Sequence, residues 1–396
     1  MTDRLIIAGG GIGGLSAGLA LHRAGLPVTV LEQAPQIQEV GTGVQVWLNG
    51  AAALARLGVG DQVQARGAPV ESQEFRSWRG SKLMEAPVGE LARRYGCPPA
   101  VVIRRPDLIG VLRAALPEGL VQTESKVEGH EQDDAGVSVR LADGRVERGA
   151  ALIGAEGLIS PTREQLSPGV RPRYAGYQYL RAMTENSGVI PEGGMTLTYG
   201  PADRFGMNDV GAGQMYWFGV IVVPEGQTDS AAGRKRDLLD RFGRFPDPIP
   251  RVIEETAEEE IFRNDICDLD PLAKWGEGRV TLLGDAAHAT TPNLGRGASE
   301  AIEDAAVLAE CLSGPEALAE GEALCRALRD YERCRMAPTA KVQSSARRIG
   351  NMASWRDPVR CRIRDVIMKR VAGKSMVKDI ESELAGAAGT SAAAGA

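Results

Sequence analysis

The pattern of apolar and polar residues predicts a strand, a helix and a second strand at the start of the chain. Residues 4–8 are almost wholly apolar, which is typical of a strand buried on both faces. Residues 14–24 have helical apolar spacing, and Gly25 with a proline just beyond it ends that helix. Residues 28–31 form a second apolar run that closes on Glu32. The opening is therefore predicted to be one βαβ unit.

Along the rest of the chain the pattern of apolar and polar residues changes twice. Residues 174–268 hold short β-like runs separated by glycine and proline turns, with a charged helical stretch at 231–242. This texture predicts a separate and mostly β domain. The regions on either side return to buried strands and long helices. Their predicted elements are a hairpin over 123–147, strands at 151–154 and 279–283, a helix over 298–312 and a basic helical region over 331–372.

Composition and charge narrow the class of protein without naming it. The chain has 396 residues, 43% of them hydrophobic and 25% charged, which fits an ordinary globular protein of about two domains. The net charge of −6 disfavours nucleic acid and acidic membranes as partners. No apolar run reaches the ~20 residues of a membrane span. The six scattered cysteines favour reduced thiols in a cytoplasmic protein over disulfides or a metal site.

A glycine-rich turn joins the first predicted strand to the first helix. Gly9 permits the tight turn, Gly11 lets the backbone approach a pyrophosphate, and Gly14 lets the helix pack on the strand. The start of the helix then offers its free N–H groups to the phosphates. Glu32 follows Gly9 by 23 residues, where it can accept the ribose hydroxyls, and its charge opposes a 2′-phosphate. The pattern predicts FAD or NAD rather than NADP.

A second motif, near residue 290, decides between these two dinucleotides. Asp285 follows a glycine at the end of a strand, where its carboxylate can hydrogen-bond a ribityl hydroxyl. Gly295 and Gly297 open the helix that runs from Ala298, and the positive end of that helix can face the N1–C2=O edge of a flavin. An NAD enzyme has no use for this second clamp. The sequence therefore predicts FAD.

With these motifs the sequence resembles the single-component, FAD-dependent aromatic hydroxylases, the para-hydroxybenzoate and salicylate hydroxylase family. The resemblance extends from Arg4 to roughly Arg348. Further matches are Gly154-Ala155-Glu156-Gly157 with Ser160 and Arg163, Gly41-Thr42-Gly43-Val44-Gln45, Arg105-Pro106-Asp107-Leu108, and Tyr331-Glu332-Arg333 with Pro338. The resemblance implies that Gly43 and Val44 lie beside the isoalloxazine ring. It also implies that Arg105 reaches the ribityl–phosphate region.

One of these matches departs from the family pattern at Glu156, where the family normally has an aspartate. In the family, that carboxylate is implicated in holding FAD and the nicotinamide cofactor. Glutamate keeps the charge and extends it by one methylene. We expect Glu156 either to bind a shifted partner or to slow reduction by NAD(P)H. Ser160-Pro161 after it predicts a helix N-cap followed by proline at the first helical position.

The resemblance implies an α/β fold: a Rossmann-like FAD-binding domain interleaved with a mostly β substrate domain and followed by C-terminal helices. The last twelve residues, rich in Ala, Gly, Ser and Thr, are expected to form a disordered tail. The expected ranges are 1–75, 98–173 and 269–350 for the FAD-binding domain, 76–97 and 174–268 for the substrate domain, 351–384 for a helical segment and 385–396 for the tail.

The resemblance also implies the chemistry. NADH or NADPH would reduce FAD, reduced FAD would react with O₂ to give a C4a-hydroperoxide, and an electron-rich ring would attack its distal oxygen. The pocket must then be apolar and closed to water, with Pro292 on the oxygen side. The predicted function is hydroxylation or epoxidation of a phenol, hydroxybenzoate, indole or polyketide by a monomer or homodimer.

The substrate side offers few ionisable groups. Histidine occurs only at positions 22, 130 and 288, outside the expected substrate domain, so we do not expect a histidine base. Either a tyrosine or an arginine activates the substrate, or the substrate needs no base. Strand alternation would aim Tyr216 and Phe218 one way and Trp217 the other. Candidate catalytic residues are Gln45, Arg181, Tyr216 and Pro292, and candidate pocket residues are Trp47, Tyr177, Tyr179, Arg204, Trp217 and Phe218.

Two alternatives stay open. The first is a flavoprotein of the same fold that transfers no oxygen, such as a reductase, a dehydrogenase or a halogenase, although the Trp-x-Trp-x-Ile signature of halogenases is missing. The second is a non-catalytic FAD-binding protein, whose only support is Glu156. For the pocket candidates, aromatic core packing and structural ion pairs of the arginines stay open as alternative interpretations.

Overall fold

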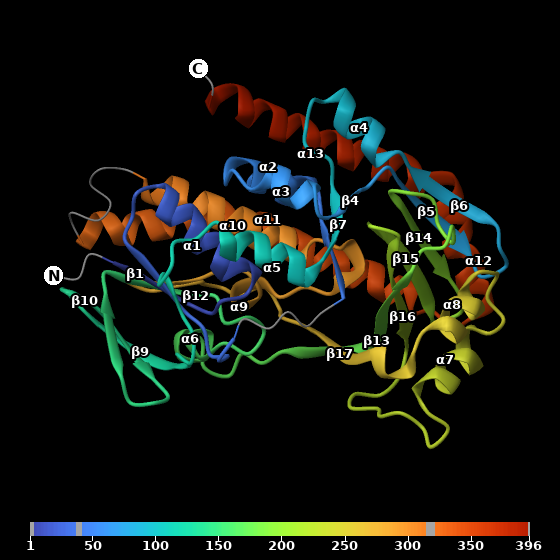
Figure 1. Ribbon diagram of the computed structural model, residues 1–396, viewed down its shortest axis with the longest axis horizontal. Helices are drawn as coiled ribbons and strands as arrows, with labels where there is room; N and C mark the ends of the chain where they lie inside the picture. The colour runs from blue at the N-terminus through green and yellow to red at the C-terminus, as the bar shows by residue number, and fades with distance from the viewer. Residues whose placement is uncertain (1–3, 37–41, 314–320, 395–396) are drawn as a thin grey trace.

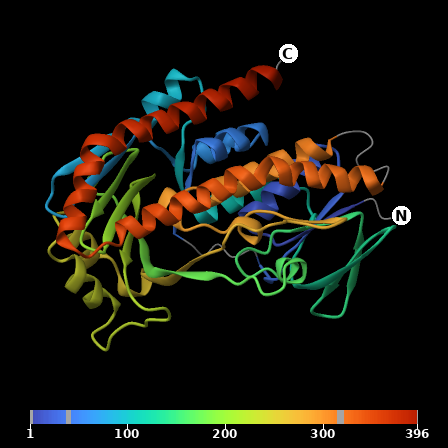
Figure 2. The same cartoon turned by 180° about the vertical axis from the view of Figure 1, so that it is seen from behind.

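The computed structural model describes residues 4–36, 42–313 and 321–394. Figure 1 shows two β regions joined by long helices, with the parallel strands β1 and β12 toward one end and the sheet of β13 to β16 toward the other. Seen from behind in Figure 2, the C-terminal helices turn at the second sheet and run back across the molecule. Among the described residues, no helix is long and apolar enough to cross a membrane.

A parallel sheet of five strands, ordered β18-β12-β1-β2-β8, organises the first region. Four of its strands are apolar runs. Helix α1 connects β1 to β2, and the other strands are joined by longer segments, because parallel strands cannot be joined by a tight hairpin. The strands are β1 (Leu5–Ala8), β2 (Val28–Leu31), β8 (Val121–Gln122), β12 (Ala151–Gly154) and β18 (Val280–Leu282). The helices of this region are α1 (Ile12–Arg23), α2 (Leu48–Arg56), α3 (Gly60–Gln64), α5 (Arg105–Ala114), α6 (Pro161–Leu166), α9 (Asp285–His288) and α10 (Gly297–Leu312).

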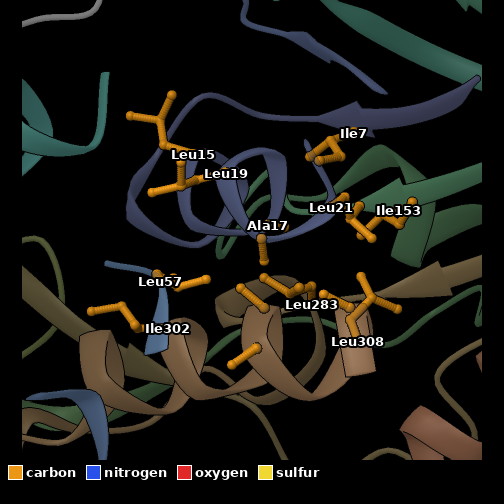
Figure 3. Close-up of a cluster of buried hydrophobic side chains, with 14 of the residues drawn as sticks. Ile7, Leu15, Ala17, Leu19, Leu21, Leu57, Ile153, Leu283, Ile302 and Leu308 are labelled. Atoms are coloured by element: carbon orange, nitrogen blue, oxygen red, sulfur yellow. The ribbon is translucent and has the colours of Figure 1, made fainter. Parts of the chain in front are cut away.

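The core of this region lies where α1 meets the sheet and α10. Every residue of α1 from Gly14 to Leu21 is buried, because the helix is covered on both sides. Figure 3 shows Ala17 of α1 pointing toward α10 and the side chains of Leu283 and Leu308, and Leu21 beside Ile153 of β12. Burying one such leucine contributes about 1.5–3 kcal/mol. The packing fixes the start of α1 against the loop that follows β18.

Two small antiparallel sheets extend this region. One has the order β11-β10-β9, with strands β9 (Val127–Asp133), β10 (Gly136–Leu141) and β11 (Val146–Gly149), and contains the predicted hairpin. The other has the order β3-β7-β4, with strands β3 (Gly43–Val46), β4 (Ala68–Pro69) and β7 (Val101–Arg104). The second small sheet places the segment after Thr42 beside the start of α5.

A mostly antiparallel sheet of seven strands, ordered β17-β13-β16-β15-β14-β5-β6, forms the second region. Helices α7 (Arg234–Phe242) and α8 (Ile249–Glu255) cover one of its faces. The sheet begins at Ser72, earlier than the boundary expected at residue 76. Its strands are β5 (Ser72–Ser77), β6 (Lys82–Ala86), β13 (Arg173–Glu185), β14 (Gly194–Tyr199), β15 (Arg204–Gly211), β16 (Gln214–Ile221) and β17 (Phe262–Asp268); α4 (Val88–Arg94) follows β6 and the short helix η1 (Glu258–Glu260) precedes β17.

The last fifth of the chain is helical. Helix α11 (Gly321–Ala353) is followed by α12 (Pro358–Ile367), a π-helical segment (Met368–Ala372) and α13 (Gly373–Ala394). The disordered tail expected over 385–396 is wrong as far as Ala394, because the structure continues α13 to that residue. Its alanines explain the difference, since alanine has the highest helix propensity and continues a helix that has already started. Residues 395–396 lie outside the described part of the chain.

Candidate flavin and substrate site

A cleft of about 1160 Å³ runs from the glycine turn of the first region to the large sheet of the second. Most of the site residues predicted from the sequence line it, although they come from distant parts of the chain. They are Gly9, Gly11, Glu32, Gly43, Val44, Gln45, Arg105, Glu156, Tyr179, Arg181, Tyr216, Phe218, Asp285, Pro292, Gly295, Gly297 and Ala298. Gly41, part of the same predicted loop, lies outside the described residues.

The glycines of the first turn each meet a different steric demand. Gly9 has φ +107°, and a Cβ there would lie 2.3 Å from the Ala155 oxygen. At Gly14 a Cβ would lie 1.8 Å from the Gly9 oxygen, so only glycine lets α1 begin this close to β1. A Cβ at Gly11 would meet nothing within 4 Å, because this residue faces the cleft. The turn therefore leaves open space at the N-terminus of α1, which fits a pyrophosphate.

Glu32 lies at the end of β2, beside this turn. Its Oε2 accepts a hydrogen bond of 2.6 Å from the Gly10 N–H, and its Oε1 accepts one of 2.8 Å from the Ala34 N–H. These two bonds fix the carboxylate at the edge of the cleft. Each carboxylate oxygen can accept more than one hydrogen bond, so the ribose hydroxyls of a dinucleotide fit this end.

The second motif forms the floor of the cleft. Asp285 begins α9 just after β18, and its side chain is reached through the cleft while protein surrounds it on the other sides. Burial raises the pKa of this carboxyl, and the nearby Arg105 opposes the rise. Gly295 has φ +65°, and a Cβ there would overlap the Gln45 side chain. A polyol and a flat ring fit this arrangement of one carboxylate and close backbone.

A buried ionic network supports the floor from below. Asp304 of α10 accepts hydrogen bonds from the Gly284 N–H at 3.0 Å and from Arg335 Nε at 2.6 Å, and its Oδ2 lies 2.6 Å from His288 Nε2. Burial alone would raise the pKa of Asp304, but His288 and Arg335 hold it at about 2. Burial lowers the pKa of His288, and Asp304 more than offsets this, so the pKa of His288 is raised. The histidine is a structural hydrogen-bonding partner of Asp304 and lies outside the cleft lining.

Sequence reasoning missed this network and the role of Asn293. The signal available for the network was three carboxylates, at 300, 303 and 304, inside an apolar helix pattern.

Asn293 lies between the predicted Pro292 and Gly295 and bonds both to the large sheet and to α11. Its Oδ1 accepts from Arg204 Nη2 at 2.5 Å, and its Nδ2 donates to the Ala346 oxygen at 2.9 Å.

Glu156 is turned toward the start of α6. Its carboxylate accepts a hydrogen bond of 2.7 Å from Ser160 Oγ and further bonds from the hydroxyl and the N–H of Thr162. Burial raises its pKa, and these hydrogen bonds oppose the rise. Ser160 also caps α6 by accepting from the Arg163 N–H. The longer side chain of glutamate thus reaches the start of α6, where Ser160 and Thr162 are the partners of its carboxylate.

Aromatic side chains of the large sheet form the far wall of the cleft. The rings of Tyr179 and Phe218 stack with centroids 5.3 Å apart, and Tyr216 lies 5.7 Å from Phe218. Burial raises the pKa of Tyr216, while Arg181 and Thr42 oppose the rise through charge and hydrogen bonding. Burial likewise raises the pKa of Tyr179. Burial therefore favours the protonated form of both phenols, in which they can donate hydrogen bonds.

Four predicted pocket residues do not line the cleft. Trp217 points to the opposite face of the sheet, where it stacks on Phe205 and donates to Thr256 Oγ1 at 3.0 Å. This follows the predicted strand alternation, so including Trp217 in the pocket was wrong. The other three are Trp47, which packs in the core around Tyr216, and Tyr177 and Arg204, which are buried against each other and Asn293.

Comparison with known proteins identifies the family. The model of the family described as FAD binding domain matches residues 1–346. The chain belongs to this family. It is 38% identical over 368 residues to the aurachin C monooxygenase/isomerase of Stigmatella aurantiaca, covering 93% of this chain and 94% of that protein. It is 33% identical to the FAD-dependent urate hydroxylase of Klebsiella pneumoniae, covering 83% and 85%.

Solved structures agree with this assignment. Klebsiella pneumoniae HpxO, solved with FAD and uric acid, has a TM-score of 0.88 at 28% identity, covering 96% of both chains. A salicylate hydroxylase solved with substrate has a TM-score of 0.80 at 23% identity, covering 97% of both, and shows the same fold. This flavoprotein is an FAD-dependent monooxygenase of the aromatic hydroxylase family, and the glycine turn, Glu32 and the floor around Asp285 fit its cofactor.

Proposed function

We propose that this monooxygenase uses NADH or NADPH and O₂ to hydroxylate a flat aromatic heterocycle that carries an acidic oxygen. One atom of O₂ enters the ring, and the other leaves as water with the two electrons of the nicotinamide. Bound FAD supplies the electron transfer from the nicotinamide and the activation of O₂. The observation that carries the proposal is the aromatic wall of Tyr179, Tyr216 and Phe218 in the same cleft as the flavin-binding motifs.

Arg181 is proposed as the group that orients the substrate. It lines the cleft between Tyr216 and Asn264, and within the described residues its buried Nε has no hydrogen-bond acceptor. An anionic ring oxygen would give this donor an acceptor and gain a charge-assisted bond. The protonated Tyr216 would donate a second bond. Because no histidine lines the described cleft, the substrate itself would carry the charge that makes its ring electron-rich.

The relatives support a flat aromatic substrate, which is a heterocycle in most of them and a substituted benzoate in one. By their names they act on aurachin C, urate, 3-amino-4-hydroxybenzoate and 6-hydroxynicotinate. We propose that the backbone of Gly295 and Gly297 and the positive end of α10 face the oxygen side with Pro292. The stacked rings would exclude water there, which protects the oxidising equivalents from loss as H₂O₂.

Substrate-stimulated turnover tests the proposal. The purified, FAD-loaded protein would be given NADH or NADPH and a panel of hydroxylated quinolines, pyridines and purines. We expect one compound to accelerate nicotinamide oxidation about tenfold or more and to gain one ¹⁸O atom from ¹⁸O₂ by mass spectrometry. Stimulation with H₂O₂ as the sole product would contradict oxygen transfer, and a protein that neither nicotinamide reduces would favour a binding protein.

A variant pair tests the orienting role. Arg181→Met should raise KM for the accelerating compound by about tenfold or more, the loss expected for one charge-assisted bond. The same change at Arg236, an exposed residue paired with Asp240 on α7, should leave KM unchanged. Equal KM values for both variants would remove Arg181 from the substrate site.

A further inference from the structure

The segment from α12 to the start of α13 has an apolar outer face. Eight large hydrophobic side chains are exposed among the described residues, and five of them lie within these few turns. They are Val359, Ile363, Val366, Ile367 and Val371, with exposed fractions of 66%, 49%, 46%, 42% and 60%. Scattered exposed apolar residues are ordinary, but a cluster on one helical face marks an interaction surface.

The inner face of the same segment is firmly attached to the protein. Arg364 is fully buried, donates to the Gly200 oxygen at 3.0 Å and lies over the Tyr199 ring at 5.1 Å. Cys361 and Met368, one turn to either side, are also buried. The outer face is therefore held in a fixed orientation and is not the frayed end of a helix. Figure 2 shows this segment where the helical chain turns back at the edge of the molecule.

The charge around the apolar face is strongly positive. Residues 356–378 contain eight Lys or Arg and two Asp, in a chain whose net charge is −6. Seven of these cations are exposed: Arg356, Arg360, Arg362, Lys369, Arg370, Lys374 and Lys378. The net charge of −6 is a sum over the whole chain and hides the local excess of cations in this segment. It disfavours an acidic membrane as a partner only when the chain is considered as a whole. A helix with apolar side chains and flanking cations has the composition of a helix that lies in a membrane interface.

We propose that this outer face docks the enzyme onto an anionic lipid bilayer. The valines and isoleucines would enter the boundary between headgroups and acyl chains, and the seven cations would contact the anionic headgroups. Charge complementarity favours lipid over a second copy of the chain, because two copies meeting through this face would bring cations against cations. The proposal rests on this surface alone and does not depend on the identity of the substrate.

Vesicle co-sedimentation of the full-length, FAD-loaded protein tests this proposal. Vesicles of phosphatidylcholine with about one third phosphatidylglycerol would be compared with phosphatidylcholine alone, at low and high salt. We expect binding to the anionic vesicles that weakens with salt. Equal binding to both vesicle types, or no binding to either, would overturn the proposal.

Matched variants locate the binding face. Ile363→Asp with Val366→Asp should reduce the partition coefficient at least tenfold, and Lys369→Glu with Arg370→Glu should reduce it about fivefold per charge removed. Val146→Asp, at a 59% exposed residue of β11, should leave binding unchanged. The flavin spectrum confirms folding of each variant. A wild-type dimer in sedimentation velocity that the Ile363→Asp pair turns into a monomer, without vesicle binding, would assign the face to a second copy instead.

Discussion

The two ends of the cleft are built in different ways. At the flavin end the ligand contacts the backbone. Positions such as Gly9 and Gly14 require glycine there, because a Cβ would overlap a carbonyl oxygen. At the substrate end the ligand meets side chains of neighbouring strands, such as Tyr179 and Phe218. A site formed by the backbone requires glycine at fixed positions, and this pattern can be recognised in a sequence. A wall formed by side chains can be built from many combinations of residues, so it leaves no fixed pattern.

The largest effect is expected from Gly14→Ala. The new Cβ would lie 1.8 Å from the Gly9 oxygen, so α1 must move away from β1 and the phosphate site opens. We expect the protein to lose more than nine tenths of its FAD, measured as the ratio of flavin to protein absorbance. The control is Gly110→Ala on α5, where the nearest atom is 4.0 Å away and alanine should be neutral or stabilising by up to ~1 kcal/mol.

The next effect concerns the network beneath the floor. Asp304→Asn leaves His288 without its buried anion and leaves Arg335 paired only with Glu300 and Glu303, which should lower the free energy of unfolding by about 3–5 kcal/mol. Urea denaturation measures it. Glu310→Gln, in the exposed pair with Arg56, should cost less than ~1 kcal/mol. Similar losses for the two variants would mean that the floor does not depend on Asp304.

Adjacent residues of β16 should separate substrate binding from stability. Tyr216→Phe should lower kcat/KM for the accelerating compound about tenfold with full FAD content. Trp217→Phe removes the bond to Thr256 on the other face and should lower stability by about 1–2 kcal/mol while kcat/KM stays within about twofold. If Trp217→Phe impaired turnover more than Tyr216→Phe, the assignment of the two faces would be reversed.

The smallest effect is the pH dependence of stability. The raised pKa of folded His288 contributes stability that is complete below about 6.5 and is lost as pH rises through the raised value. Asp304, with a pKa of about 2 against an ordinary 3.8, contributes stability above 3.8 that is lost as pH falls toward 2. Denaturation across pH should show both slopes, and His288→Gln should remove the alkaline one.

The sequence predicted the flavin end closely because each motif combines a turn with the strand and helix that flank it. It predicted Tyr216 and Phe218 on one face of β16 from alternation alone. The same alternation places Trp217 on the opposite face, which the structure shows. The sequence did not separate Arg204 from the cleft, because nothing local to its strand distinguishes it from the residues of the wall. Arg204 is paired with Val220 of the adjacent strand β16, and its side chain donates to Asn293, which lies 89 positions away in the chain.

The sequence by itself determined the βαβ opening, the dinucleotide turn, the second flavin clamp and the family. These features are local, since a glycine, a helix start and a carboxylate act within a few residues of one another. Only the tertiary structure decided which aromatic side chains line the cleft, where the Glu156 carboxylate points, and that the apolar side of α12 faces outward. Each of these depends on contacts between segments distant in the chain, which strand pairing and helix packing bring together.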